Sequence, residues 1–78
     1  MDSRIKLIAT AHPDEDRMLV EIDIEGHNVA ELLEAEGDYE LLLYPRPGGG
    51  PWSFSASLWS EAVEAAHRRL DALLGRHG

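Results

Sequence analysis

The 78-residue chain contains no cysteine, and its apolar runs fall far short of the roughly 20 residues that cross a bilayer. Without cysteine there is no disulfide and no thiolate site, so the fold does not depend on the redox compartment. Seven basic residues stand against fifteen acidic ones, and a pI of about 4.7 argues against direct binding to nucleic acid or an anionic membrane. The N-terminal residues lack the features of a signal peptide, and we expect a cytoplasmic protein.

The acidic residues are concentrated in the first part of the chain. Twelve of the fifteen precede Pro45, together with only three basic residues, whereas the remainder carries three acidic and four basic residues. An apolar content of 44% is ordinary for a globular protein, so the charge does not indicate disorder. We expect one domain spanning residues 1–78, with a stability of roughly a few kcal/mol.

Two segments near the N-terminus alternate between apolar and polar residues with a period of two. They are Arg4–His12 and Arg17–Glu25, and the alternation is typical of half-buried strands. Pro13–Asp16 lies between them, where proline and aspartate favour a turn. The sequence therefore predicts a β-hairpin.

A short helix is predicted next, over Asn28–Ala35. Asn28 and Glu31 have the spacing of a capping box, and Gly37 is typical of a helix end. Two turns are too few for a helix that is stable by itself, so it must dock on the rest of the domain. An extended loop is the alternative.

The remaining elements are read from strand propensity, proline and glycine content, and helical spacing. They are a strand at Tyr39–Tyr44, an irregular loop at Pro45–Pro51, a short strand at Trp52–Phe54, and an amphipathic helix at Leu58–Leu74 that Ser55 or Ser57 caps and Gly75 ends.

These elements predict an α+β fold. A four-stranded, mainly antiparallel sheet, in the order β-β-short α-β-β-α, packs one face against a long C-terminal helix. The expected core consists of Ile5, Leu7, Val20, Ile22, Ile24, Leu41, Leu43, Phe54, Val63, Leu70 and Leu73.

The string Ala-His-Pro-Asp-Glu-Asp at Ala11–Asp16 resembles the Ala-His-Pro-Asp-Asp-Glu signature of the zinc-dependent N-acetylglucosaminyl deacetylase family. The resemblance implies His12 and Asp14 as metal ligands, and it places Glu15 where the family has aspartate. It covers six residues only. A catalytic zinc site takes three protein ligands, and the other histidines are isolated in the sequence. We therefore predict a hairpin turn here and no metal site.

Nothing else in the sequence points to catalysis. Carboxylates are abundant, but acid–base chemistry needs them in unlike environments, and a strand face open to water does not provide this. The run Gly48–Gly50 is not followed by a helix, as phosphate-binding loops are. We expect neither an enzyme nor a bound cofactor.

The organised acidic series is the first candidate for a binding surface. Like charges on neighbouring strands reduce the stability of a sheet, so their retention suggests a cationic partner, although solubility alone is the competing explanation. Tyrosine, arginine and tryptophan near the proline- and glycine-rich loop are residue types common at binding hot spots. The candidate partner-binding residues are Asp14, Glu15, Asp16, Glu21, Asp23, Glu25, Tyr44, Arg46 and Trp52.

We therefore expect a non-catalytic acidic module that binds a basic protein such as a nuclease, a toxin or a defence complex. Its carboxylates would imitate phosphates, as in an inhibitor, an immunity protein, an antitoxin or a phage-encoded blocker. The hypothesis requires that the arginines of the C-terminal segment leave the acidic strands unneutralised. The alternative is a homo-oligomeric structural or accessory subunit, for example a homodimer, joined through an apolar sheet face. That face comprises Ile8, Leu19, Leu42 and Tyr44.

Overall fold

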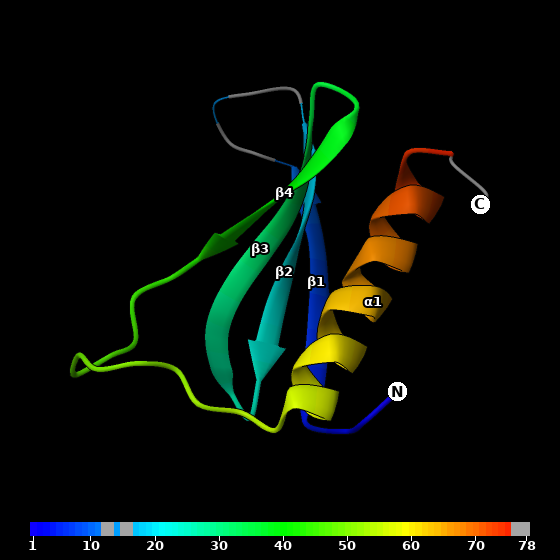
Figure 1. Cartoon of the computed structure of the whole chain (residues 1–78). Helices are drawn as coiled ribbons and strands as arrows, with labels where there is room; N and C mark the ends of the chain where they lie inside the picture. Colours follow the sequence, from blue (N-terminus) through cyan, green and yellow to red (C-terminus); the bar gives the residue numbers. More distant parts are fainter. Residues whose placement is uncertain (12–13, 15–16, 76–78) are drawn as a thin grey trace.

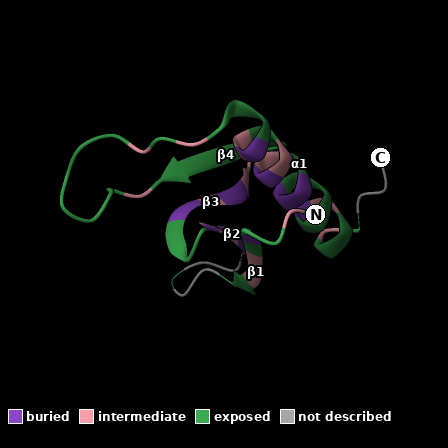
Figure 2. Ribbon diagram, turned by 90° about the horizontal axis from the view of Figure 1, so that it is seen from below, coloured by how far each residue is buried: buried purple, intermediate pink, exposed green. Residues whose placement is uncertain are grey.

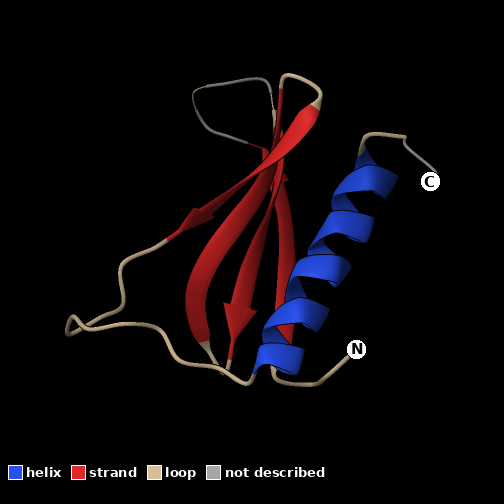
Figure 3. Cartoon of the chain, in the orientation of Figure 1, coloured by secondary structure: helices blue, strands red, loops and turns tan. Residues whose placement is uncertain are grey.

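A computed structural model describes residues 1–11, 14 and 17–75. The chain forms a four-stranded antiparallel sheet in the order β1-β2-β3-β4, and helix α1 packs across one face of it (Figures 1 and 3). The predicted α+β class, with four strands and a long C-terminal helix, is confirmed. The elements are β1 Ile5–Ala11, β2 Met18–Ile24, β3 His27–Ala35, β4 Asp38–Leu43 and α1 Ala56–Leu73.

The predicted short helix is wrong, because residues 27–35 form strand β3. Two turns of isolated helix are marginal in water, whereas this segment hydrogen-bonds on both sides, to β2 and to β4. Its apolar residues do not alternate cleanly because a bulge opposite Ile22 and Asp23 shifts the register and because both faces of the strand are partly buried.

Two Glu-Gly pairs make the turns on either side of β3. Glu25 and Gly26 have φ angles of 54° and 84°, and Glu36 and Gly37 have φ angles of 51° and 83°. Two successive residues with positive φ form the tight turn that matches the twist of a hairpin. Gly37 therefore ends a strand rather than a helix, and β2, β3 and β4 form a meander.

The predicted strand at Trp52–Phe54 is also wrong, since the whole segment between β4 and α1 is irregular. Its aromatic rings nevertheless pack. Trp52 stacks on Phe54 with 5.7 Å between ring centroids, and Phe54 stacks on Trp59 of α1 at 6.2 Å. The indole nitrogen of Trp52 donates a hydrogen bond of 2.7 Å to the carbonyl of Tyr44. These contacts attach the loop without a strand.

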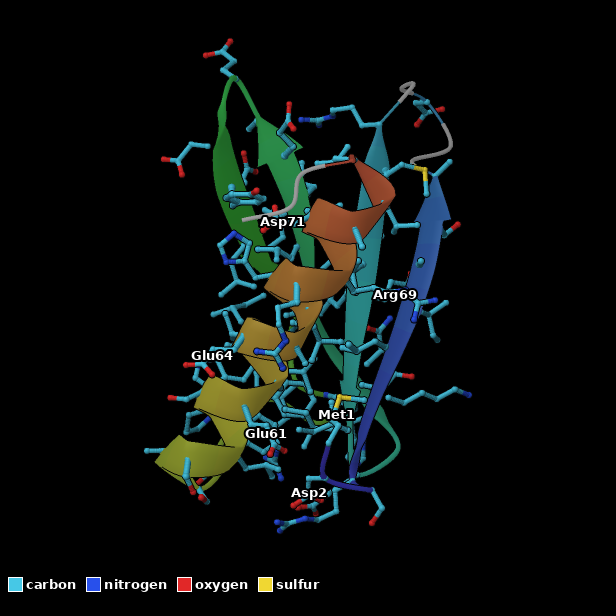
Figure 4. The ribbon with its side chains drawn as sticks, turned by 90° about the vertical axis from the view of Figure 1, so that its right-hand side faces the viewer. Met1, Asp2, Glu61, Glu64, Arg69 and Asp71 are labelled. Carbon is cyan, nitrogen blue, oxygen red and sulfur yellow. The ribbon has the colours of Figure 1, made fainter. Side chains whose placement is uncertain are left out.

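Helix α1 begins at Ala56, two residues before the predicted Leu58, and the first of the two predicted caps is the one used. Ser55 is the N-cap, and its hydroxyl accepts a hydrogen bond from the backbone N–H of Leu58 at 3.3 Å. Near the start of α1, the N–H of Asp2 donates to the Glu61 carboxylate at 3.0 Å, and Figure 4 shows these two residues at the same end of the helix. Near its other end, Asp71 accepts a hydrogen bond from the hydroxyl of Tyr39, on β4.

The core lies between α1 and the sheet, and α1 packs mainly on β2, with β1 and β3 beside it (Figure 2). The structure confirms Ile5, Val20, Ile22, Ile24 and Leu70 as buried core residues. The prediction that three further leucines are buried in the core is wrong. Two of them lie on β4, which α1 does not cover along its length, and Leu73 lies on the exposed side of the helix. These exposed leucines are Leu41, Leu43 and Leu73. The buried residues of the core cluster are Ile5, Val20, Ile22, Ile24, Val29, Ala30, Leu32, Leu58, Ala62, Ala66 and Leu70.

Candidate interaction surface

The sheet face turned away from α1 carries the acidic residues of the strands, and we call it the outer face. Side chains alternate between the two faces, so the strand register assigns its members. One row across it joins Ile8, Glu21, Glu31 and Leu42 as successive cross-strand partners. By this register the outer face comprises Lys6, Ile8, Thr10, Leu19, Glu21, Asp23, Asn28, Glu31, Leu33, Ala35, Asp38, Glu40 and Leu42.

Glu21 and Glu31 are the central feature of the outer face. They are direct partners in the β2–β3 register, and both are half-buried. Carboxylates directly opposite each other on neighbouring strands repel, and partial burial weakens the screening by water. The pair therefore reduces the stability of the sheet unless a cation lies near it.

Tyr44, just beyond β4, partly stabilises this pair. Its hydroxyl donates a hydrogen bond of 2.5 Å to the Glu31 carboxylate. Burial raises the pKa of the Tyr44 hydroxyl well above its ordinary value of 10.0, and the neighbouring Glu31 and Glu21 carboxylates raise this pKa further. The hydroxyl therefore remains a neutral donor, and it solvates Glu31 without removing its charge.

Asp23 lies on the same face, two residues after Glu21 on β2. Its Oδ1 atom is buried and has no hydrogen-bond partner within the described part of the chain. Its register partner on β1 is Lys6, whose side chain is exposed. A buried carboxylate oxygen without a donor is a destabilising feature that a bound donor would relieve.

Lys6 lies on the outer face opposite Asp23, but none of the described basic residues forms an ion pair with an outer-face carboxylate. Arg4 forms an ion pair with Asp2 at 2.7 Å, and the Arg17 guanidinium donates to the backbone carbonyl of Glu34 at 3.1 Å. Arg68 and Arg69 are exposed residues of α1, which covers the opposite face; Figure 4 labels Arg69 on that helix. Among residues 1–11, 14 and 17–75, no ion pair reaches the five outer-face carboxylates, Glu21, Asp23, Glu31, Asp38 and Glu40.

The predicted binding residues therefore separate into groups. Glu21 and Asp23 lie together on the outer face, with Tyr44 beside them. Glu25 is exposed in the β2–β3 turn, and Asp14 is exposed between β1 and β2. Glu15 and Asp16 lie outside the described residues, as do His12 and Pro13 of the zinc-like string.

Arg46 and Trp52 lie elsewhere, in the segment that follows β4. The Arg46 guanidinium donates to the carbonyl of Gly49 at 3.0 Å. Both residues line a hollow of about 490 Å³, together with His27. Trp52 also packs against the core cluster on the helix side, so this pair does not extend the outer face.

Sequence reasoning missed Glu31 as a member of the acidic sheet face, because it placed this residue on a helix. The signal for the correct assignment is the repeated Glu-Gly pair at residues 25–26 and 36–37, which separates strand-length segments. With β3 as a strand, the alternation places Glu31 on the same face as Glu21.

Sequence reasoning also missed a groove between β4 and α1. A hollow of about 270 Å³ is lined by apolar residues, and a second of about 300 Å³ adjoins it at Trp59. We call the two together the β4 groove. Its lining residues are Val29, Leu41, Leu43, Trp52, Phe54, Trp59, Ser60, Val63 and Glu64.

No family model matches the chain, and neither a curated protein nor a solved structure does. In the described ranges, no group of three or more histidine, aspartate or glutamate side chains could hold a metal ion. The single helix of those ranges is not apolar enough over its length to cross a membrane. The site is therefore defined by its own geometry alone.

Proposed function

We propose that this protein is a non-catalytic acidic module that binds a basic surface of a partner protein through its outer face. The observation that supports this proposal is the half-buried pair of Glu21 and Glu31, which face each other without an ion pair to any described basic residue. A domain of this size has roughly a few kcal/mol of stability, so a repulsive pair is retained at a noticeable cost. A cationic partner explains it.

The chemistry of the partner follows from the arrangement of the charges. Carboxylates spaced along adjacent strands resemble a row of phosphates, and lysine or arginine side chains that bind phosphates also bind carboxylates. The net charge of −8 accelerates encounter with a cationic groove and makes association sensitive to salt. Nucleases, toxins and defence complexes carry such grooves, and the proposed role is to occupy one of them in the cytoplasm, as an inhibitor or immunity-type protein does.

The rival function, a homo-oligomer joined through an apolar sheet face, has less support. Ile8 and Leu42 lie at opposite ends of one row, and Glu21 and Glu31 lie between them. Leu19 is buried within its own chain. A second copy placed on this face would bring four glutamates together in the centre of the interface.

Affinity capture with matched variants tests the proposal. The bait carries Glu21→Gln and Glu31→Gln together, which removes both charges while keeping the side-chain shape and an acceptor for Tyr44. The control bait carries Glu36→Gln, which removes one charge in the exposed β3–β4 turn. We expect wild-type and control baits to retain a basic, nucleic-acid-binding protein that the double variant loses and that duplex DNA displaces.

The captured protein is then titrated at low salt and at about 0.5 M salt, where charges more than a few ångströms apart are screened. We expect the affinity to fall by at least about tenfold. An affinity that is unchanged by salt, or a double variant that binds as well as wild type, contradicts the proposal.

A further inference from the structure

Strand β4 is an edge of the sheet, and its free edge presents backbone groups that can pair with another strand. The N–H of Tyr44 donates to the carbonyl of Val29 on β3 at 2.8 Å. In an antiparallel ladder, alternate residues turn their N–H and C=O groups to the same neighbour. The backbone groups of Leu41 and Leu43 therefore point outward, away from β3.

The N–H of Tyr39 shows the same alternation. It points away from β3 and donates a hydrogen bond of 2.7 Å to the side-chain carboxylate of Asp38. The N–H of Tyr39, the first outward-pointing donor of the free edge, is therefore not available to an added strand. The open positions that remain are those of Leu41 and Leu43.

The side chains of the same two leucines lie over the β4 groove. Leu41 is 38% exposed and Leu43 is 61% exposed, although both belong to the face that α1 covers elsewhere. Figures 1 and 2 show the reason, because the end of β4 diverges from α1 in both views. Trp59 and Val63 of α1 form the opposite wall.

The other side of β4 carries an acidic residue beside an apolar one. Glu40 and Leu42 point to the outer face, next to Leu33 and Glu31 on β3. A strand added to β4 would place alternate side chains in the apolar groove and the others on the outer face beside Glu40 and Leu42, with Glu31 one strand further in. The fitting sequence alternates apolar and basic residues.

We propose that an extended segment of the basic partner, with alternating apolar and basic residues, adds to β4 as a fifth strand. This inference rests on the proposed function and specifies how the partner engages the sheet. Main-chain hydrogen bonds to Leu41 and Leu43 supply affinity, while the groove and Glu40 supply selectivity. The acidic outer face then continues beyond the added strand as the surface for the remaining basic residues of the partner.

The opposite edge of the sheet does not offer this combination. On β1 the outer-face residues Lys6 and Thr10 carry no negative charge. On the helix side, Ile5 is buried and Leu7 packs against the core, so no groove comparable to that at β4 is formed there by the described residues.

A second copy of the chain is a poorer occupant of the β4 edge. Antiparallel pairing of β4 about Leu41 brings Glu40 opposite Leu42 of the other copy, with the two Glu40 carboxylates on a diagonal. Each copy also carries a net charge of −8. A basic strand meets the same carboxylates with opposite charge.

Short synthetic peptides test the fifth strand directly, with the intact protein labelled for amide NMR. The first peptide alternates lysine and valine, and the second has the same composition with lysines and valines in separate blocks. A third alternates them but carries N-methyl groups on alternate backbone amides, so that it cannot donate along one edge. We expect only the first to shift the amides of Leu41 and Leu43 and the indole of Trp59.

Protein variants complete the test. Glu40→Lys reverses a charge beside the added strand, and we expect about five- to tenfold weaker binding of the alternating peptide. Glu36→Lys makes the same change in the β3–β4 turn and should alter affinity less than about twofold. Leu41→Pro removes an outward N–H that β3 does not use, and edge strands accept proline at such positions. We expect it to abolish binding while circular dichroism confirms the fold.

Three results would overturn the fifth-strand proposal. They are equal binding of the alternating and blocked peptides, binding of the N-methylated peptide as tight as that of its parent, and shifts confined to Glu21 and Glu31. The last result leaves the acidic-module function standing, whereas insensitivity of partner capture to the Glu21 and Glu31 variants rejects that function. Concentration-dependent dimerisation that Leu41→Pro abolishes would assign the edge to a second copy instead.

Discussion

The two faces of the sheet differ sharply although the same strands build both. On β2, the helix-side residues Val20 and Ile22 are completely buried, whereas Glu21 between them faces outward, half-exposed. The helix face contains the main apolar cluster. The outer face combines charged residues with apolar ones, of which Leu19 and Leu33 are buried and Leu42 is exposed.

This contrast shows how a small domain can keep repulsive charges on its surface. Burial against α1 supplies most of the apolar stabilisation, so the outer face contributes less and can accept unfavourable charges. Substitutions that change the two faces separately should show this division directly.

The largest expected effect comes from the helix face. Ile22 has no exposed surface, and Ile22→Ala removes buried methyl and methylene groups and leaves a cavity. We expect a loss of about 2–5 kcal/mol in the free energy of unfolding, enough to unfold much of the population. Urea titration followed by circular dichroism measures it. Leu42→Ala, at a residue that is 41% exposed on the outer face, is the control and should cost about 1 kcal/mol or less.

The second effect tests whether the outer face contributes to stability at all. Leu33 is 2% exposed and is the direct register partner of Leu19, although no helix covers them. We expect Leu33→Ala to reduce the free energy of unfolding by about 2–3 kcal/mol. A loss below that of Leu42→Ala in the same urea titration would show that the acidic face has no apolar support of its own.

The same contrast explains which parts of the fold could be predicted from the sequence. The hairpin strands β1 and β2 and helix α1 have clear periodicities, of two residues and of three to four, because one side of each faces a core and the other faces water. Ser55 as the helix cap is equally local. These elements were predicted correctly, apart from small differences in their bounds.

Strand β3 was missed because its pattern reflects tertiary surroundings rather than local preference. It is central in the sheet, so Leu32 is buried on one face and Leu33 on the other, and the bulge adds an extra residue at Val29. The resulting run resembles a helical face. The groove beside Leu41 and Leu43 was missed for a related reason, since the divergence of β4 from α1 is not encoded in any single segment.

A smaller effect of opposite sign is expected at the acidic pair. Glu21→Gln removes one of two facing charges while keeping the side-chain shape, so it should raise the free energy of unfolding by about 0.5 kcal/mol at low salt. The gain should shrink as salt screens the repulsion. Glu36→Gln, in the exposed turn, is the matched control and should change little. A destabilised Glu21→Gln would mean that the carboxylate is satisfied within the chain.

The last effect concerns the alkaline titration of Tyr44, whose hydroxyl is hydrogen-bonded to the outer-face residue Glu31. Burial and the Glu31 carboxylate raise the pKa of Tyr44 above its ordinary value of 10.0 in the folded protein. The folded state therefore binds this proton more tightly than the unfolded state, so the associated stability is complete below about pH 10 and is lost as the pH rises through the higher folded pKa.

Ultraviolet absorbance of the phenolate measures this titration, and Tyr39→Phe leaves Tyr44 as the only tyrosine. We expect its ionisation to occur well above pH 10 in the native protein and near pH 10 in urea. Adding Glu31→Gln should move the native titration toward the ordinary value without reaching it, because burial remains. An unchanged titration in that variant would show that the Glu31 charge does not act on the hydroxyl, and the electrostatic part of the contrast between the two faces would then be wrong.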